Sequence, residues 1–314
     1  MRPAPYFFLL ICSIIILISD FYTYKGIKKI NINFLKRHKR IFKYIFWSVP
    51  ISIIIALFLM LKFRTSVNPQ TGMIYFHYLS GAFLLFNIPK LIFIVLNLVD
   101  DIYHFIKYLA HKIKHIKSDK SDVEKISRST FLTRAGIIIA GIPFVSIIYG
   151  IGWGRFNFLV RKSNISSSKI PKDFDGFKIV QFSDFHLGSF ISNEDKVKEV
   201  VKLINAQHPD LILFTGDLVN NLAAELESFV PILAKLRAKY GMYSILGNHD
   251  YGEYVPWNSQ QEKQDNLNRI IEFQKNIGFK MMLNESTKIN IGDSFITLIG
   301  VENWGLPPFP QYGD

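Results

Sequence analysis

The chain has 314 residues and a mass of 36.3 kDa, which is enough for two ordinary domains. Its content of 49% hydrophobic residues and its mean hydropathy of +0.19 exclude a disordered or wholly soluble protein. The formal charge of +12 is unevenly distributed, because residues 1–154 carry 20 basic and 6 acidic residues whereas 155–314 carry 17 and 19. The positive charge therefore indicates membrane topology and excludes a nucleic-acid-binding face.

Four apolar segments in the first half each approach the ~20 residues that a membrane-spanning helix needs. They are 6–22, 42–61, 74–99 and 135–153. We expect the first to be a retained anchor and not a signal peptide, because no small-residue cleavage site follows it. Lys90 lies in the second half of the third segment, and we expect it to snorkel toward the nearer interface. The single cysteine, Cys12, excludes a disulfide framework and a Cys-based zinc site.

The loops between these segments differ in charge. Residues 23–41 carry seven Lys and Arg residues and 100–134 carry eight, whereas the loop between the second and third segments carries only Arg64, with Lys62 at its edge. Positively charged loops stay in the cytoplasm. We therefore expect the first and third loops to be cytoplasmic, and everything after Trp153 to be extracytoplasmic.

The second half changes to short β-branched and aromatic runs that alternate with longer amphipathic stretches. Strands are expected at 177–183, 211–215, 242–246, 279–283 and 294–301, and helices at 193–207, 222–239 and 260–277. Repeated strand, loop and helix predict a parallel or mixed α/β sheet. The expected organisation is a membrane domain over 1–154 and an α/β domain over 155–314.

Each of the first three expected strands ends in a polar cluster. Asp184, Asp217 and Asn248 mark these clusters, and they are separated by 33 and 31 residues, about one βαβ unit each. Loops at the carboxyl ends of neighbouring strands line one crevice in open α/β sheets, so the clusters should meet. Their carboxylates, imidazole and amide oxygen suit divalent metals such as Mn, Fe or Zn. Two such ions about 3.5–4 Å apart make hydroxide from a shared water and offset charge on a phosphoryl oxygen, which is chemistry for phosphate-ester hydrolysis.

The motifs D-F-H, G-D and G-N-H-D, in this order at the ends of strands, resemble the first three motifs of the calcineurin-like metallophosphoesterases, most closely their membrane-anchored bacterial branch. The resemblance implies a metallophosphoesterase-type α/β sandwich with two divalent metal ions. It implies that Asp184 and His186 ligate the first ion, that Asp217 bridges both, and that Asn248 binds the second. It also implies that His249 is not a ligand but faces the substrate, where it stabilises the transition state or protonates the leaving oxygen.

The family pattern continues with a later histidine and a G-H-x-H element, and neither is present in these 314 residues. His208 precedes the second expected strand and therefore lies at the wrong end of the sheet to replace them. The sandwich is accordingly expected to be incomplete and short of strands. We expect the sequence to be a fragment or an interrupted reading frame of a longer enzyme, which by itself binds metal weakly or not at all and is inactive.

Three functions are compared. The first is a membrane-anchored enzyme that hydrolyses phosphate mono- or diesters, with lipid-linked substrates favoured by the tether. The second is a non-catalytic membrane receptor or scaffold with a degenerate phosphoesterase fold, which a stop codon directly after Asp314 would support. The third, a transporter, has only the four spans in its favour. Asp184 and Asp217 could instead be helix N-caps, but the polar residues beside them make this less favoured than a role as ligands. Glu302 also lies after an expected strand, and we favour a structural role for it.

Overall fold

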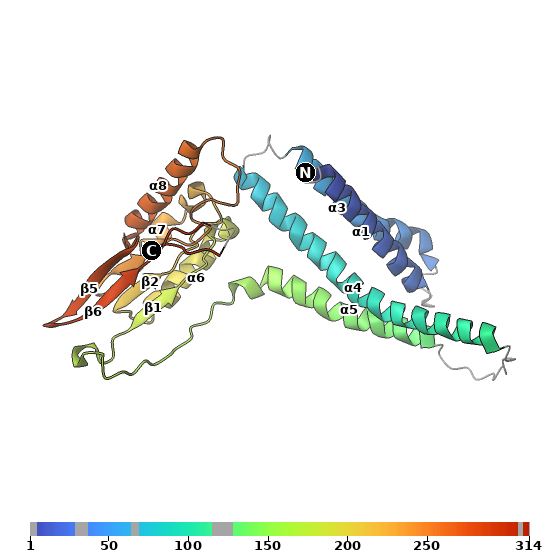
Figure 1. Cartoon of the computed structure of the whole chain (residues 1–314), viewed down its shortest axis with the longest axis horizontal. Helices are drawn as coiled ribbons and strands as arrows, with labels where there is room; N and C mark the ends of the chain where they lie inside the picture. Colours follow the sequence, from blue (N-terminus) through green and yellow to red (C-terminus); the bar gives the residue numbers. More distant parts are fainter. Residues whose placement is uncertain (1–4, 29–36, 64–68, 115–127, 307–309, 314) are drawn as a thin grey trace. The chain divides into compact units, whose positions relative to one another are not determined.

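A computed structural model describes residues 5–28, 37–63, 69–114, 128–306 and 310–313 (Figure 1). The chain divides into two compact units, Met1–Asn157 and Phe158–Asp314. Many of the basic residues on which the predicted orientation depends, in 29–36, 64–68 and 115–127, lie outside the described residues.

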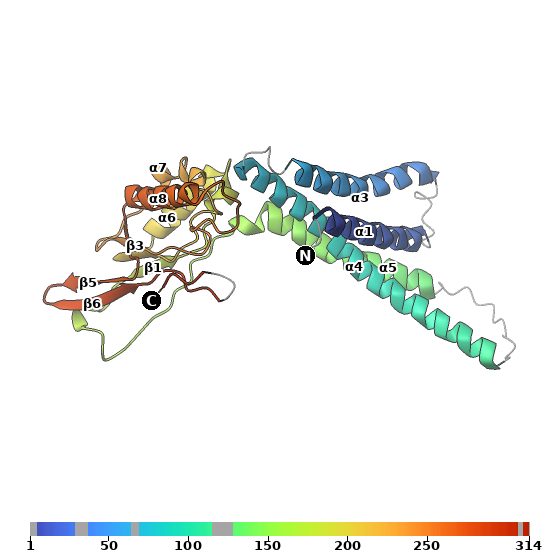
Figure 2. The ribbon, with the colours of Figure 1, turned by 45° about the horizontal axis from the view of Figure 1, so that its top comes forward.

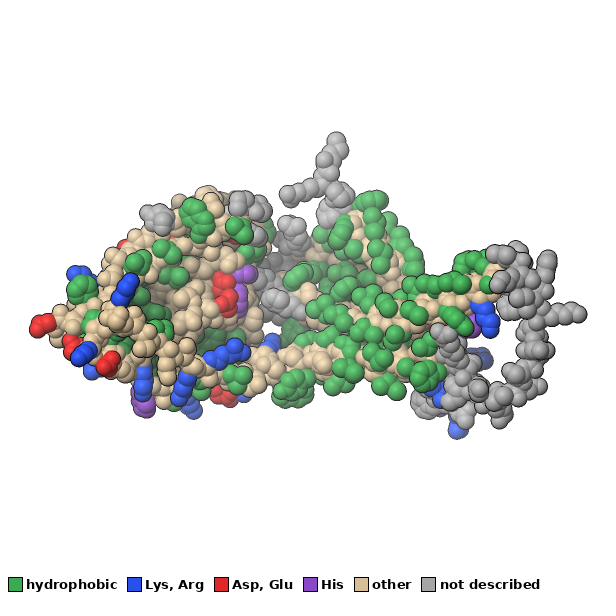
Figure 3. All heavy atoms as spheres, turned by 60° about the horizontal axis from the view of Figure 1, so that its bottom comes forward, with side chains coloured by type: hydrophobic (Ala, Val, Ile, Leu, Met, Phe, Trp, Pro, Cys, Tyr) green, Lys and Arg blue, Asp and Glu red, His purple; other side chains and the backbone are tan. Residues whose placement is uncertain are grey.

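The first unit is helical. It contains α1 (Pro5–Lys28), α3 (Lys39–Lys62), α4 (Pro69–Lys114) and α5 (Arg128–Gly152). Four stretches are long and apolar enough to cross a membrane, namely Tyr6–Lys28, Lys39–Lys62, Tyr78–Ala110 and Phe131–Phe156, the last of which runs past the end of α5. Figure 3 shows hydrophobic side chains covering these helices. The prediction of four apolar spans is therefore confirmed, although the third continues further along the chain than expected.

Lys90 has a close acidic partner inside the helical unit, which the sequence did not reveal. Its Nζ atom lies 2.6 Å from Oδ1 of Asp20 on α1, and the side chain of Asp20 is only 1% exposed. A charge inside an apolar bundle is stabilised by a close partner of opposite charge. The ion pair therefore joins α1 to α4.

Other polar contacts also hold the helical unit together. The hydroxyl of Tyr22 on α1 donates to Oδ2 of Asp101 on α4 at 2.6 Å. On the α5 side, the hydroxyl of Thr133 donates to Oδ1 of Asn97 on α4 at 2.9 Å. Hydrogen bonds between helices replace the contacts with water that these polar groups lose in lipid. The first helix thus packs as part of the bundle.

The second unit is built on a parallel sheet of four strands in the order β1-β2-β3-β4 (Figures 1 and 2). The strands are β1 (Ile179–Phe182), β2 (Leu211–Phe214), β3 (Met242–Ser244) and β4 (Phe279–Met281). The connections contain α6 (Glu194–Asn205), α7 (Val230–Leu233) and α8 (Gln260–Ile277), together with the short 3₁₀ helices η3 (Leu187–Phe190) and η4 (Ala223–Leu226). The predicted parallel α/β architecture is confirmed.

Different elements pack on the two faces of this sheet. Figure 2 shows α6, α7 and α8 along one face. The other face packs against an antiparallel hairpin of β5 (Glu285–Ile291) and β6 (Ser294–Gly300), whose Ile289 joins Leu211 and Tyr243 in one buried cluster. Residues alternate between the faces along each strand, so each strand contributes to both layers. The second layer contains two strands among the described residues.

Two elements differ from the sequence prediction. The helix expected over 222–239 is broken into η4 and α7, since Pro231 lies in the first turn of α7 and cannot donate a hydrogen bond to a preceding turn. Strand β5 was not predicted, because its sequence is mostly polar and only Ile289 is fully buried. Both differences concern elements whose local pattern is weak.

Candidate metal centre

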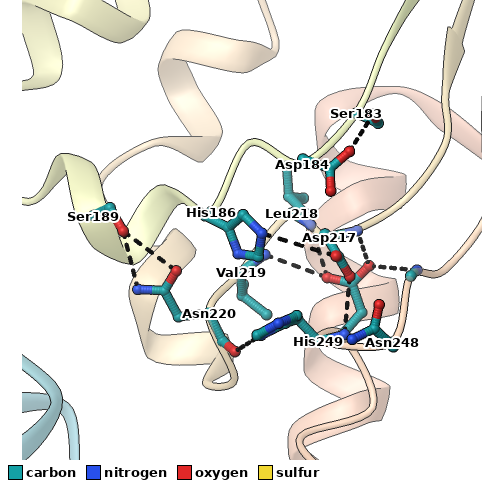
Figure 4. Close-up of polar contacts among 12 residues, drawn as sticks. Ser183, Asp184, His186, Ser189, Asp217, Leu218, Val219, Asn220, Asn248 and His249 are labelled. Atoms are coloured by element: carbon teal, nitrogen blue, oxygen red, sulfur yellow. Dashed lines mark hydrogen bonds and ion pairs between the residues drawn. The ribbon is translucent and has the colours of Figure 1, made fainter. Parts of the chain in front are cut away.

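The loops that follow β1, β2 and β3 are hydrogen-bonded to one another at the carboxyl end of the sheet (Figure 4). The backbone N–H of Asp184 donates to the carbonyl of Gly216, and that of His186 donates to the carbonyl of Asp217, both at 3.0 Å. From the third loop, the N–H of His249 donates to Oδ1 of Asp217 at 2.9 Å. The predicted meeting of the three clusters is thus observed.

The backbone of these loops is unusual. Asp184, His186 and Asp217 have φ angles of 54°, 49° and 61°, in the left-handed region that non-glycine residues seldom occupy. Such conformations cost about 1–3 kcal/mol each and are concentrated at functional sites. Gly216 and Gly247 pack so closely that a Cβ at Gly247 would overlap Oδ1 of Asp217. These turns therefore need glycine because they have no room for a side chain.

Three side chains converge at the junction of the loops. The potential ligand atoms of His186, Asp217 and His249 all lie within 4.8 Å of one another. Nε2 of His186 is 3.8 Å from Oδ2 of Asp217, and the two imidazole rings meet edge to face with their centroids 4.7 Å apart. Asp217 is 8% exposed, so its carboxylate is largely shielded from water. Imidazole nitrogen and carboxylate oxygen at these separations suit a divalent transition metal.

The other two predicted ligands lie on the same loops. The Asp184 carboxylate accepts a hydrogen bond from the hydroxyl of Ser183, and Nδ2 of Asn248 donates to the hydroxyl of Tyr254 at 2.7 Å. Figure 4 shows Asp184 and Asn248 on either side of Asp217. Asp184 is not a member of the group of three that lies within 4.8 Å.

His249 has one ring nitrogen engaged. Its Nδ1 lies 2.7 Å from the carbonyl oxygen of Asn220. A carbonyl oxygen only accepts hydrogen bonds, so Nδ1 carries the hydrogen in this contact. The remaining ring nitrogen, Nε2, is therefore the atom that can exchange a proton or bind a metal.

Asp250 supports the site, and the sequence did not reveal this role. It is fully buried, with one oxygen accepting from the N–H groups of Asp217 at 2.8 Å and Gly247 at 2.9 Å, and the other from Leu218 at 2.9 Å. Burial raises the pKa of the Asp250 carboxyl to about 6, although the donated N–H groups act in the opposite direction. Its position at the end of G-N-H-D was the only signal in the sequence.

Glu225 on η4 is a second supporting carboxylate that the sequence did not reveal. It is 3% exposed and accepts from the backbone N–H groups of Asn220 at 2.6 Å, Leu222 at 3.0 Å and Asn221 at 3.1 Å. Burial raises the pKa of Glu225, against the lowering effect of these donors. Because His249 donates to the carbonyl of Asn220, Glu225 also holds the acceptor of that contact in place.

Glu302, which follows β6, has structural partners as expected. It accepts from the hydroxyl of Tyr251 at 2.9 Å and from Nδ2 of Asn284 at 2.9 Å. These contacts join the end of the hairpin to the loop after β3. Neither of these contacts of Glu302 involves His186, Asp217 or His249.

Two family models match the chain. Residues 1–155 match the model described as a probable calcineurin-like phosphoesterase transmembrane domain, and residues 177–304 match the calcineurin-like phosphoesterase model. The chain belongs to the calcineurin-like metallophosphoesterases. The first match covers the helical unit and the second covers the sheet and its loops. The predicted family is confirmed, and the chain is that of a multi-pass membrane protein.

Curated relatives agree with this assignment. The metallophosphoesterase YkuE of Bacillus subtilis is 41% identical over 141 residues, which are 42% of this chain and 48% of YkuE. A transmembrane protein with a metallophosphoesterase domain from Danio rerio is 28% identical over 138 residues, 44% of this chain and 31% of the relative. The UDP-2,3-diacylglucosamine pyrophosphatase LpxG of Chlamydia trachomatis is 41% identical over 91 residues, 27% of each chain. The chain spans about half the length of the first relatives it matches. No solved structure matches it.

Proposed function

We propose that the protein is a membrane-anchored, metal-dependent phosphoesterase that hydrolyses phosphate mono- or diesters. The convergence of His186, Asp217 and His249 within 4.8 Å is the observation on which this proposal rests. Membership of the calcineurin-like metallophosphoesterases supports it. The chain spans about half the length of YkuE. The proposed activity is therefore assigned to the whole protein, by which we mean a protein of the relatives' full length that contains this chain.

The chemistry of the donors suggests how the site would be used. Asp184 and His186 would hold one divalent ion of Mn, Fe or Zn, Asn248 would hold a second, and Asp217 would bridge them. Ions bound there supply hydroxide at neutral pH and offset negative charge on a phosphoryl oxygen. Four ligands shared by two ions leave coordination positions open, so the 314-residue chain alone is expected to hold metal weakly.

His249 would act as the general acid. Its Nδ1 is engaged by Asn220, so Nε2 is the nitrogen from which a proton can pass to the leaving oxygen. The rings of His186 and Tyr254 both contact the imidazole, which restrains its orientation. A positioned acid of this kind contributes about 10²–10⁴-fold to a rate.

The location and substrate follow from charge and attachment. The basic stretches 23–41 and 100–134 favour a phosphoesterase domain over 155–314 on the extracytoplasmic side of a membrane domain over 1–154. Attachment to the bilayer favours substrates that carry acyl chains. One relative, LpxG, is named for a diacylated nucleotide-linked sugar, and it supports a lipid-linked phosphate as the substrate class.

Metal-dependent hydrolysis of p-nitrophenyl phosphate and bis-p-nitrophenyl phosphate by the whole protein tests the proposal. We expect activity with added Mn²⁺ and none with a chelator. Asp217→Asn should abolish it, because the amide supplies one neutral oxygen in place of the bridging carboxylate. The matched control is Asp210→Asn at the start of β2, where the carboxylate accepts from the N–H of Lys178 at 2.9 Å.

The control variant should retain the activity of the unmodified protein. Equal hydrolysis by the Asp217→Asn variant, or hydrolysis that is unaffected by a chelator, would contradict the metal-dependent enzyme. A whole protein that binds the esters without hydrolysing them would favour the receptor or scaffold.

A further inference from the structure

We propose that Tyr254 is a positioning residue of the candidate centre, which sets the orientation of both the Asn248 amide and the His249 ring. The inference rests on the proposed function, because it assigns Asn248 and His249 their roles. Tyr254 lies in the loop after β3, six residues beyond Asn248 and five beyond His249.

The first contact engages the amide nitrogen of Asn248. Nδ2 of Asn248 donates to the hydroxyl of Tyr254 at 2.7 Å. A side-chain amide has its nitrogen and its oxygen on opposite arms, and only the oxygen can bind a cation. With Nδ2 held by Tyr254, Oδ1 faces away from the hydroxyl and stays available. The opposite orientation would present an N–H group where a metal ligand is needed.

The second contact restrains the ring of His249. The rings of Tyr254 and His249 are stacked, with centroids 4.5 Å apart and an angle of 28° between their planes. His186 meets the same imidazole edge to face at 4.7 Å, and Asn220 accepts from its Nδ1 at 2.7 Å. Stacking therefore adds a third restraint to the ring that would deliver the proton.

Tyr254 is not placed there by burial. The residue is 46% exposed, so it contributes little to the hydrophobic core. Its backbone N–H donates to Oδ1 of Asn221 at 3.2 Å, which connects the loop after β3 to the loop after β2. An exposed tyrosine that uses both its hydroxyl and its ring on two site residues is better explained by a role in the site.

Tyr251 provides a matched control three residues earlier in the same loop. Its hydroxyl donates to Glu302 at 2.9 Å and its ring stacks on Tyr312 with centroids 4.1 Å apart. Both tyrosines thus make one hydroxyl contact and one ring contact, but neither of these contacts of Tyr251 reaches Asn248 or His249. Removing each hydroxyl in turn separates an effect on the site from an effect on the loop.

The first test needs no metal. The side-chain amide resonance of Asn248 is followed by NMR in the ¹⁵N-asparagine-labelled 314-residue chain in detergent micelles, and it is assigned from the peak missing in Asn248→Ala. Tyr254→Phe should shift this resonance and accelerate its exchange with water several-fold, whereas Tyr251→Phe should leave it unchanged. An Asn248 resonance that is the same in the unmodified chain and in Tyr254→Phe would overturn the proposal.

The second test is a double-mutant cycle on Mn²⁺ affinity, followed by the EPR signal of free Mn²⁺. Tyr254→Phe should weaken binding about tenfold, the usual cost of removing an outer contact of a ligand. The same change in an Asn248→Ala background should not weaken binding further, because the amide that Tyr254 contacts is absent. Equal weakening in both backgrounds would overturn the proposal. Failure of the unmodified 314-residue chain to bind Mn²⁺ would agree with the weak binding expected of it, and the amide resonance would then decide the role of Tyr254.

Discussion

Replacing Lys90 by methionine is expected to lower the free energy of unfolding of the membrane unit by about 3–5 kcal/mol, because a buried charge loses its partner. Asp20 is completely buried, and its Oδ1 lies 2.6 Å from Nζ of Lys90. Apart from this ion pair, neither oxygen of Asp20 has a hydrogen-bond partner among the described residues. The unpaired carboxylate would have to stay charged in an apolar interior or take up a proton. Unfolding of the purified chain in mixed micelles by a denaturing detergent measures the loss.

The double variant Lys90→Met with Asp20→Leu gives the sharper result. Replacing both members of a buried ion pair by apolar side chains of similar volume is often neutral, so it should recover most of the lost stability. Lys62→Met, at the exposed end of α3, serves as the control and should change little. A double variant as unstable as the single one, or a single variant as stable as the unmodified chain, would show that the pair does not stabilise the bundle.

Replacing His249 by alanine is expected to slow the hydrolysis of aryl phosphates by the whole protein about 10²–10⁴-fold while its metal content is unchanged. The reason is that Nε2, the ring nitrogen that Asn220 does not engage, would be the proton donor to the leaving oxygen. The loss should be larger for phenyl phosphate than for p-nitrophenyl phosphate, because p-nitrophenolate is the better leaving group and needs less help from an acid. Steady-state kinetics with both esters, together with metal analysis, provide the measurement.

His208→Ala is the control, since His208 lies next to the start of β2, away from the loops of the candidate centre. A loss of metal from the His249→Ala variant would identify His249 as a ligand and would contradict its assignment as the acid. Its position in the group of three potential ligands is compatible with that outcome. Equal losses with the two esters would also contradict it.

Much of the architecture could be predicted because its signals are local. The spans are long and largely apolar runs, and the first three strands are short β-branched or aromatic runs that end in polar motifs. The loops carrying His186, Asp217 and His249 could be placed together because parallel strands bring their carboxyl ends to one edge. These features need no knowledge of contacts between distant residues.

The remaining features depend on such contacts. Asp20 and Lys90 are seventy positions apart on different helices, and nothing in either apolar run shows that they pair. Asp250 and Glu225 act through backbone N–H groups, which every sequence has and which therefore leave no pattern. Tyr254 looks like an ordinary loop tyrosine until its contacts with Asn248 and His249 are seen.

The most direct test of the metal centre is anomalous X-ray diffraction from crystals of the chain soaked in Mn²⁺. We predict a manganese peak about 2.0–2.3 Å from both Nε2 of His186 and a carboxylate oxygen of Asp217, the usual separations of such ligands. Manganese found only elsewhere on the protein, with the side chains of His186 and Asp217 directed apart, would contradict the existence of a metal centre at the ends of these strands.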